Sequence, residues 1–317
     1  MYLFYDQSCS WEKDYVIKTL LRNCEVDVRF LTDKQIRDPN YFITLHNERG
    51  DVIFNNIFLF SSNPDHSKSR SKGNLAQKLN KYEIAHIVKF IRPKVIMHFS
   101  DEVGGRGELN LLTHFSPLVL RQYSYSNYLR FKNLLHIPLG YMNKMFEDDY
   151  ENIKVKPVDQ RQYKWSFVGE MKKDRTEMII KFKNIKPYKF EKMSAQQMRD
   201  LYRDSIFVPN GRGNFRLDCF RLYEATICGA IPVVVGNANE IRTTFSVLGE
   251  PPFLYCVNWN DAVLRCYQLL QEEGLVELKK MQKALIKWWS GEMNMIRERI
   301  DQALKYSDTP VLPASNS

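Results

Sequence analysis

Short apolar runs alternate with amphipathic stretches along most of the chain. Runs rich in β-branched and aromatic residues predict strands, and stretches with apolar residues three or four apart predict helices. The predicted strands are Tyr2–Tyr5, Val26–Phe30, Val52–Phe60, Val95–Phe99, Val119–Gln122, Leu134–Pro138, Tyr163–Gly169, Lys186–Phe190, Ile206–Pro209, Ile231–Val235 and Phe253–Cys256. The predicted helices lie at about residues 11–22, 74–91, 107–114, 174–184, 194–204, 216–228, 259–271 and 273–304. This alternation predicts parallel sheets with right-handed crossover connections.

Local signals mark several element ends. The apolar spacing of the helix at 74–91 continues to Phe90, and Pro93 follows its end. Ser194 and Gln197 have the spacing of a capping box, and Gly229 stands where a helix C-cap is expected. Ser61–Gly73 is polar and aperiodic, which predicts a long loop.

A polar segment divides the chain into two halves. Asp148–Gln162 interrupts the alternation and contains Lys156-Pro157, so we place a domain boundary there. Residues 1–150 and 151–317 then each contain one α/β unit that is long enough to bury a core. The sequence therefore predicts two Rossmann-like domains that face each other across a cleft.

Composition excludes several classes of protein. The 317 residues are 44% hydrophobic and 26% charged, which does not fit a disordered chain, a coiled coil or a disulfide scaffold. The chain has no apolar run long enough to span a membrane, and Met1–Asp6 has the pattern of a strand rather than a signal peptide. Six cysteines without C-x-x-C spacing indicate reduced thiols and no zinc site. These features predict a cytoplasmic location.

The charge distribution favours an anionic small ligand. The net charge is +9, but the basic residues are spread along the chain. A nucleotide would be attracted by such a surface, whereas a nucleic-acid binder usually concentrates its basic residues. We therefore expect no nucleic-acid partner. All six histidines lie in the first half, so a catalytic histidine would have to come from there.

One segment carries most of the candidate chemistry. It consists of a strand and glycine-rich loop at 207–214, a helix at about 216–228 and a strand at 231–235. Such a loop lies at the carboxyl end of a parallel strand, where open α/β sheets bind ligands, and the following helix favours anions at its N-terminus. Arg212, Arg216 and Arg221 add positive charge. Arg221 and Glu224 share a helix face, so they would either hold a diphosphate and a ribose diol or pair with each other.

Three segments resemble exostosin-family glycosyltransferases, which are inverting enzymes with the two-domain GT-B fold. Asp218-Cys219-Phe220-Arg221-Leu222-Tyr223-Glu224-Ala225 with the following Gly229-Ala230-Ile231-Pro232-Val233 resembles the family's donor-binding segment. Trp165-Ser166-Phe167-Val168-Gly169-Glu170 with Arg175 resembles the opening of its C-terminal domain. The residues from Ile96 to Glu102, with Val119–Tyr123 and Ile137–Gly140, resemble the short, virus-encoded exostosin-like xylosyltransferases. The matches span roughly residues 95 to 240.

The resemblance implies a nucleotide-sugar donor, usually a UDP-sugar, held by the second domain. Glu224 would hold the ribose, and Arg221 and Arg175 would hold the diphosphate together with amides near Gly169 and Gly213. Asn210 and Arg212 of the same loop are further donor-binding candidates. The chain has no D-x-D triplet, the usual metal–diphosphate clamp of the other main glycosyltransferase fold, so we expect no essential metal and no cofactor. Cys219 departs from the serine or threonine that the family often has there.

The first domain would supply the acceptor side and the general base. Inversion needs a base that takes a proton from the acceptor hydroxyl, and Glu102, then Asp101, follow an apolar strand at its carboxyl end. His98, Arg106 and Arg121 are acceptor-binding candidates, although His98 also fits a core histidine and Arg121 a structural salt bridge. Trp288 and Trp289 fit packing in a C-terminal helix that crosses back onto the first domain.

The function expected from the sequence is inverting, metal-independent transfer of a sugar, with xylose as the first choice, from a UDP-sugar to a glycan hydroxyl. A GDP-fucose-dependent GT-B fucosyltransferase is one alternative. A basic glycan- or nucleic-acid-binding module without catalysis is the other.

Overall fold

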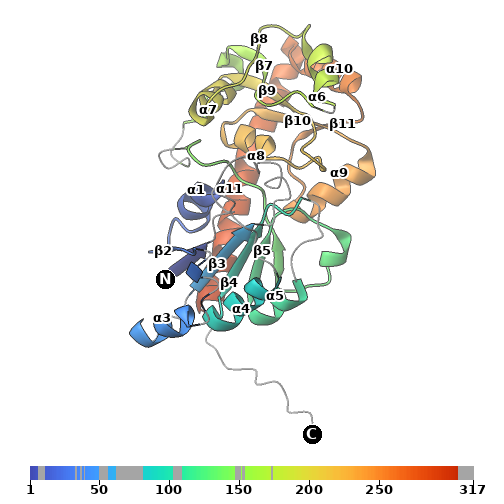
Figure 1. Cartoon of the computed structure of the whole chain (residues 1–317). Helices are drawn as coiled ribbons and strands as arrows, with labels where there is room; N and C mark the ends of the chain where they lie inside the picture. The colour runs from blue at the N-terminus through green and yellow to red at the C-terminus, as the bar shows by residue number, and fades with distance from the viewer. Residues whose placement is uncertain are drawn as a thin grey trace.

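The computed structural model describes residues 1–5, 11–32, 34–35, 38, 40–49, 56–61, 81–102, 109–146, 151, 154–172 and 174–305, which form two parallel α/β units (Figure 1). The first sheet has the order β2-β1-β3-β4-β5-β6. Its strands are β1 (Tyr2–Tyr5), β2 (Asp27–Phe30), β3 (Asn56–Ser61), β4 (Val95–Phe99), β5 (Leu118–Arg121) and β6 (Leu134–His136). Every neighbouring pair is parallel, as the alternation predicts.

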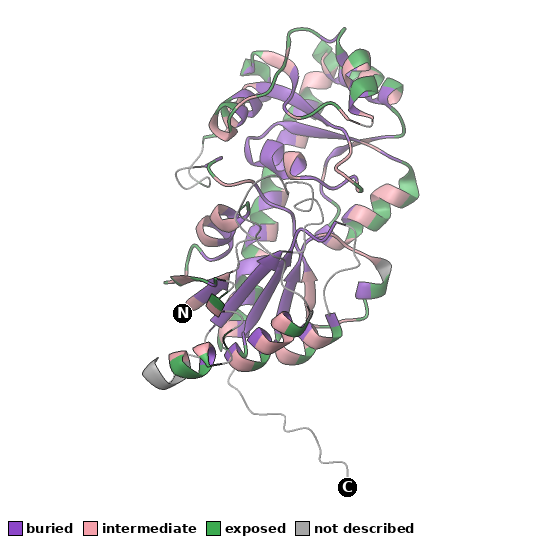
Figure 2. Cartoon of the chain, viewed as in Figure 1, coloured by how far each residue is buried: buried purple, intermediate pink, exposed green. Residues whose placement is uncertain are grey.

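Helices cover both faces of the first sheet. They are α1 (Lys13–Tyr15) with the π-helical η2 (Val16–Leu20), α3 (Tyr41–Arg49), α4 (Lys81–Ile91), α5 (Leu109–Phe115) and the 3-10 turn η5 (Ser126–Tyr128). Alternate residues of β3 enter different cores: Ile57 and Leu59 pack with η2, whereas Phe58 and Phe60 pack with α4. Because both faces are covered, the central strands are continuously buried (Figure 2).

The second sheet has the order β11-β10-β9-β7-β8. Its strands are β7 (Tyr163–Phe167), β8 (Tyr188–Phe190), β9 (Ser205–Asn210), β10 (Ile231–Val235) and β11 (Leu254–Cys256). The connecting elements are η7 (Val158–Gln160), α6 (Arg175–Phe182), α7 (Ala195–Arg203), α8 (Phe220–Ile227), α9 (Ala238–Phe245), η8 (Ser246–Leu248), α10 (Trp259–Leu269) and η9 (Glu272–Gly274).

The long helix α11 (Leu275–Lys305) joins the two units, which confirms the predicted C-terminal crossing helix (Figure 1). Trp289 is buried and lies against the rings of Tyr15 in the first unit and Tyr223 in the second. Further along the helix, Arg297 donates to the carbonyl of Thr19 at 2.8 Å. The Trp288 ring lies against the rings of Tyr223 and Phe253, and its indole N–H donates to the Leu248 carbonyl. Both tryptophans therefore have a packing role.

Most predicted elements are present, with a few differences. α3 and α9 were not predicted, and the helix expected at 11–22 is divided into α1 and a π-helical segment. The capping box of Ser194 and Gln197 is confirmed, and Gly229 has a φ of +69° after α8. Residues 62–80, Cys9 and Arg106 lie outside the described residues. The five described cysteines are free thiols, and no described helix is long and apolar enough to cross a membrane.

Candidate active site

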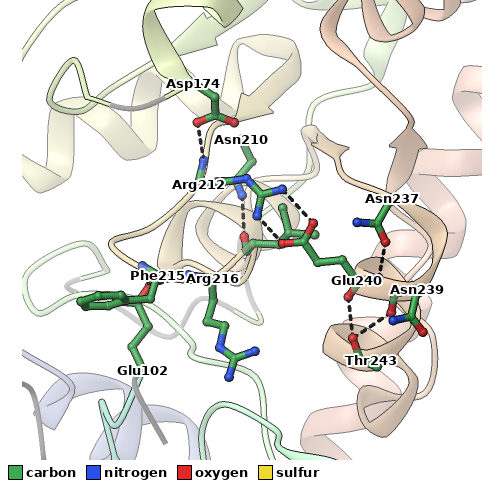
Figure 3. Close-up of polar contacts among 11 residues, drawn as sticks. Glu102, Asp174, Asn210, Arg212, Phe215, Arg216, Asn237, Asn239, Glu240 and Thr243 are labelled. Atoms are coloured by element: carbon green, nitrogen blue, oxygen red, sulfur yellow. Dashed lines mark hydrogen bonds and ion pairs between the residues drawn. The ribbon is translucent and has the colours of Figure 1, made fainter.

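The carboxyl ends of the two sheets meet at Glu102. This residue follows β4, and its Oε1 accepts hydrogen bonds from the backbone amides of Phe215 (2.7 Å) and Arg216 (3.0 Å), in the loop after β9 (Figure 3). The Tyr125 hydroxyl donates to the Glu102 carbonyl oxygen. Glu102 is only 8% exposed. The first candidate base therefore touches the glycine-rich loop that the sequence assigns to the donor.

The loop between β9 and α8 is held in shape by its own polar groups. Asn210 donates to the Leu217 carbonyl at 3.1 Å, and the Gly213 amide donates to the Arg216 carbonyl at 2.9 Å. A Cβ at position 213 would lie 2.8 Å from the Glu102 Oε1, so a side chain there would displace the carboxylate. Cys219, at the position where the family often has a hydroxyl, donates its thiol hydrogen to Asn210 Oδ1.

Arg175 and Arg221 form a pair of cations at the carboxyl end of β7. Both guanidinium groups face the ring of Phe167, with Cζ 5.8 and 5.0 Å from its centroid. Arg175 donates to the carbonyls of Arg212 and Glu170, and Arg221 donates to the carbonyl of Val168.

Neither arginine of this pair has an ion-pair partner among the described residues. Burial and then the charge of Arg221 lower the pKa of Arg175. The carboxylates of Asp174 and Glu224 act on this pair electrostatically without forming an ion pair, so the two neighbouring guanidinium groups keep the capacity to bind an anion.

Arg212 has a different role. Its guanidinium forms a two-point ion pair with Glu240 of α9, with Nη2 2.7 Å from Oε2, and its amide donates to Asp174 Oδ1 at 3.0 Å (Figure 3). The hydrogen bond between Arg212 and Glu240 is the main reason that the pKa of Arg212 is raised. Arg212 thus ties the loop to α9 and α6, and its charge is already neutralised.

Glu224 lies on α8 and points toward the first unit. It is 1% exposed, and its Oε1 accepts from the Met142 amide at 3.3 Å. Burial raises its pKa to about 7, and the hydrogen bond from the Met142 amide partly offsets this rise. Burial also raises the pKa of Asp218 to about 7, and the charge of Glu102 adds to this effect. The ribose role of Glu224 stays a prediction.

Asp101, His98 and Arg121 form a closed cluster on the first sheet. Arg121 is fully buried, its Nη2 lies 2.5 Å from Asp101 Oδ2, and its Nη1 contacts His98 Nδ1. The His98 ring stacks on Phe60, and burial, followed by the Arg121 charge, holds its pKa well below the usual value. These contacts agree with two alternatives that the sequence left open: His98 is a neutral core histidine, and Arg121 forms a structural salt bridge.

Sequence reasoning did not single out Glu12 or Ser100 at the same edge, and it considered Tyr123, with Tyr125 and Tyr128, only as a ring that could stack on an acceptor sugar. Glu12 is buried and accepts a hydrogen bond from the Ser100 hydroxyl. Ser100 and Tyr123, after β4 and β5, have φ values of +56° and +60°, a strained conformation for non-glycine residues that is frequent at functional sites. Ser100 directly follows β4 and Tyr123 lies two residues after β5, which was the available signal for these two, whereas Glu12 precedes α1 and had no such signal.

A pocket of about 390 Å³ opens beside α9 at the same edge of the second sheet. It is lined by Gly236, Ala238, Ile241, Arg242, Phe245, Ser246, Glu250, Tyr255, Cys256 and Val257. Within the described parts of the chain, no three His, Cys, Asp or Glu side chains are grouped so that they could hold a metal ion.

No protein-family model matches the sequence, and the comparison with curated proteins gives no match. Solved structures do match the fold. HepE from Anabaena, in complex with UDP and glucose, aligns with a TM-score of 0.55 and 11% identity over 96% of this chain and 99% of that one. An α-glucosyltransferase in complex with UDP and a DNA containing an HMU base aligns at 0.54 and 9%, over 96% and 100%.

The DNA-modifying enzyme β-glucosyltransferase, studied with and without uridine diphosphoglucose, aligns at 0.51 and 13% over the same shares. These alignments cover nearly the whole of each chain. This protein therefore has the GT-B fold of glycosyltransferases. At these identities, the likeness concerns the fold.

Proposed function

We propose that this protein is an inverting glycosyltransferase that moves a sugar from a UDP-sugar to a hydroxyl group of a glycan. The observation that carries the proposal is the Arg175–Arg221 pair beside Phe167, at the carboxyl end of the second sheet. Two guanidinium groups bound only to neutral groups, beside the glycine-rich loop that leads into α8, provide the charge that a diphosphate needs. The positive charge would also stabilise the leaving nucleotide as its bond to the sugar breaks.

Uridine is the proposed base, because three GT-B proteins of the same fold were crystallised with UDP or uridine diphosphoglucose. Xylose is the proposed sugar on the resemblance to the exostosin-like xylosyltransferases. We further propose that the arginine pair replaces a metal at the diphosphate, so that transfer proceeds without an essential metal ion.

Glu102 is the proposed general base. Asp101 has an oxygen engaged by Arg121 in a fully buried cluster, whereas Glu102 lies between the two sheets, and its Oε2 has no hydrogen-bond partner among the described residues. Glu102 would take the proton of the acceptor hydroxyl as that oxygen bonds to the anomeric carbon. As this bond forms, the bond between the anomeric carbon and the diphosphate oxygen breaks, and UDP leaves with the electron pair.

A calorimetric titration in EDTA tests the donor site. Wild type is expected to bind UDP, and Arg221→Ala to bind it about 10- to 100-fold more weakly, since a hydrogen bond to a charged group contributes about 1.5–3 kcal/mol. Arg265→Ala, which removes an exposed arginine paired with Glu277, is the matched control and should bind like wild type. Comparing UDP-xylose with UDP-glucose would then identify the sugar.

The other outcomes identify the alternatives. Tighter binding of GDP than of UDP would indicate the fucosyltransferase. If no nucleotide binds, the protein is better described as a non-catalytic module, and the proposed function is wrong.

A further inference from the structure

The loop amides assigned to the diphosphate and the carboxylate assigned to the base are in direct contact. Phe215 and Arg216 direct their N–H groups at the same oxygen, Glu102 Oε1 (Figure 3). Converging backbone amides of this kind form an anion-binding concavity. We infer that Glu102 and the donor diphosphate compete for these two amides, so that donor binding releases the base. This inference rests on the proposed function.

The arginine pair holds the loop that carries these two amides. Arg175 holds the loop through two hydrogen bonds to the Arg212 carbonyl, and Arg221 holds it through Asn210 Oδ1 at 3.2 Å. The loop therefore cannot shift without disturbing both guanidinium groups. A diphosphate that spans the arginines and the loop would meet Glu102 Oε1, which already lies 2.8 Å from the Cβ position of Gly213.

Competition at this point changes what Glu102 can do. In this structure Oε1 of Glu102 is occupied by the two N–H groups and cannot accept the hydrogen of an acceptor hydroxyl. Once phosphate oxygens take those N–H groups, the lone pairs of Oε1 become available to that hydroxyl. The acceptor hydroxyl would then be deprotonated only when a donor is bound. By linkage, the same contact lowers the affinity for the donor.

The test compares wild type with Glu102→Ala and Glu102→Asp by calorimetry, using UDP, inorganic pyrophosphate and uridine as probes. Ala removes the carboxylate, and Asp keeps the charge but withdraws it by one methylene. Both variants should bind UDP and pyrophosphate about tenfold more tightly than wild type, equivalent to about 1.4 kcal/mol. Uridine lacks phosphate and should bind all three proteins equally.

The result with Asp separates occupancy of the amides from simple charge repulsion. A gain with Ala but none with Asp would mean that the negative charge alone opposes the donor, and the inference would be overturned. Equal or weaker UDP binding by both variants, with unfolding curves like that of wild type, would overturn it as well while leaving the proposed function intact. If wild type itself binds no UDP, the proposed function fails and the inference fails with it.

Discussion

Arg121 offers the sharpest test of the first domain. Its side chain is fully buried, it pairs with Asp101, which is 1% exposed, and it contacts neutral His98. Replacing it by methionine keeps most of the volume but leaves the Asp101 carboxylate without its cation. Removing one partner of a buried ion pair costs about 3–5 kcal/mol, so Arg121→Met should lower the free energy of unfolding by this amount.

A double-mutant cycle gives the magnitude of the coupling. Asp101→Asn should also be destabilising, because it leaves a buried guanidinium without its anion. The double variant removes both charges, and replacing both partners is often close to neutral, so it should be less destabilised than the sum of the two single variants. Urea unfolding followed by circular dichroism measures all four free energies.

Two results would contradict this reasoning. Additive effects of the two substitutions would show that Arg121 and Asp101 do not depend on each other. A stable Arg121→Met protein with normal UDP affinity but lost transfer would instead return Arg121 to the acceptor-binding role suggested by the sequence.

Two further substitutions test the burial seen elsewhere. Glu224→Gln keeps an acceptor for the Met142 amide. The wild-type carboxyl has a pKa of about 7 in the folded protein, against an ordinary value of 4.5. Wild type should therefore lose stability relative to the variant as pH rises from about 4.5 to about 7. The loss is on the order of 3 kcal/mol, measured by chemical unfolding at several pH values, and a difference independent of pH would contradict the shift. Trp289→Ala should cost about 3–5 kcal/mol, whereas Trp11→Ala, at a side chain 49% exposed, should change stability little; equal effects in thermal melts would refute the packing role.

The sequence predicted the fold well because both sheets are parallel and buried. Val95–Phe99 is apolar apart from His98, and Ile231–Val235 is wholly apolar. The predicted bounds of these two strands are those of β4 and β10. α9 was missed, although Asn237 caps its first turn by accepting from the Glu240 amide. Phe245 is the only buried residue of α9. The apolar face of this helix is therefore short and gives little periodic pattern from which a helix could be predicted.

The candidate site was predictable in its parts rather than in its contacts. Position after a strand was enough to single out Glu102, and the glycine-rich loop was enough to single out residues 210–213. Their hydrogen bonds join residues 113 and 114 positions apart, and no local pattern encodes such a pairing. The same holds for Arg212, whose partner Glu240 lies on a helix that the sequence did not reveal.

The path of α11 affects the order in which the protein can acquire its structure during synthesis. Domains usually fold in the order in which they leave the ribosome. Here the core around Tyr15 is closed by Trp289 and Met293, and the end of η2 is held by Arg297, all from the last helix of the described chain. The first sheet is therefore synthesised before the helix that covers one of its faces. A ribosome-bound chain exposes that apolar face until α11 has emerged.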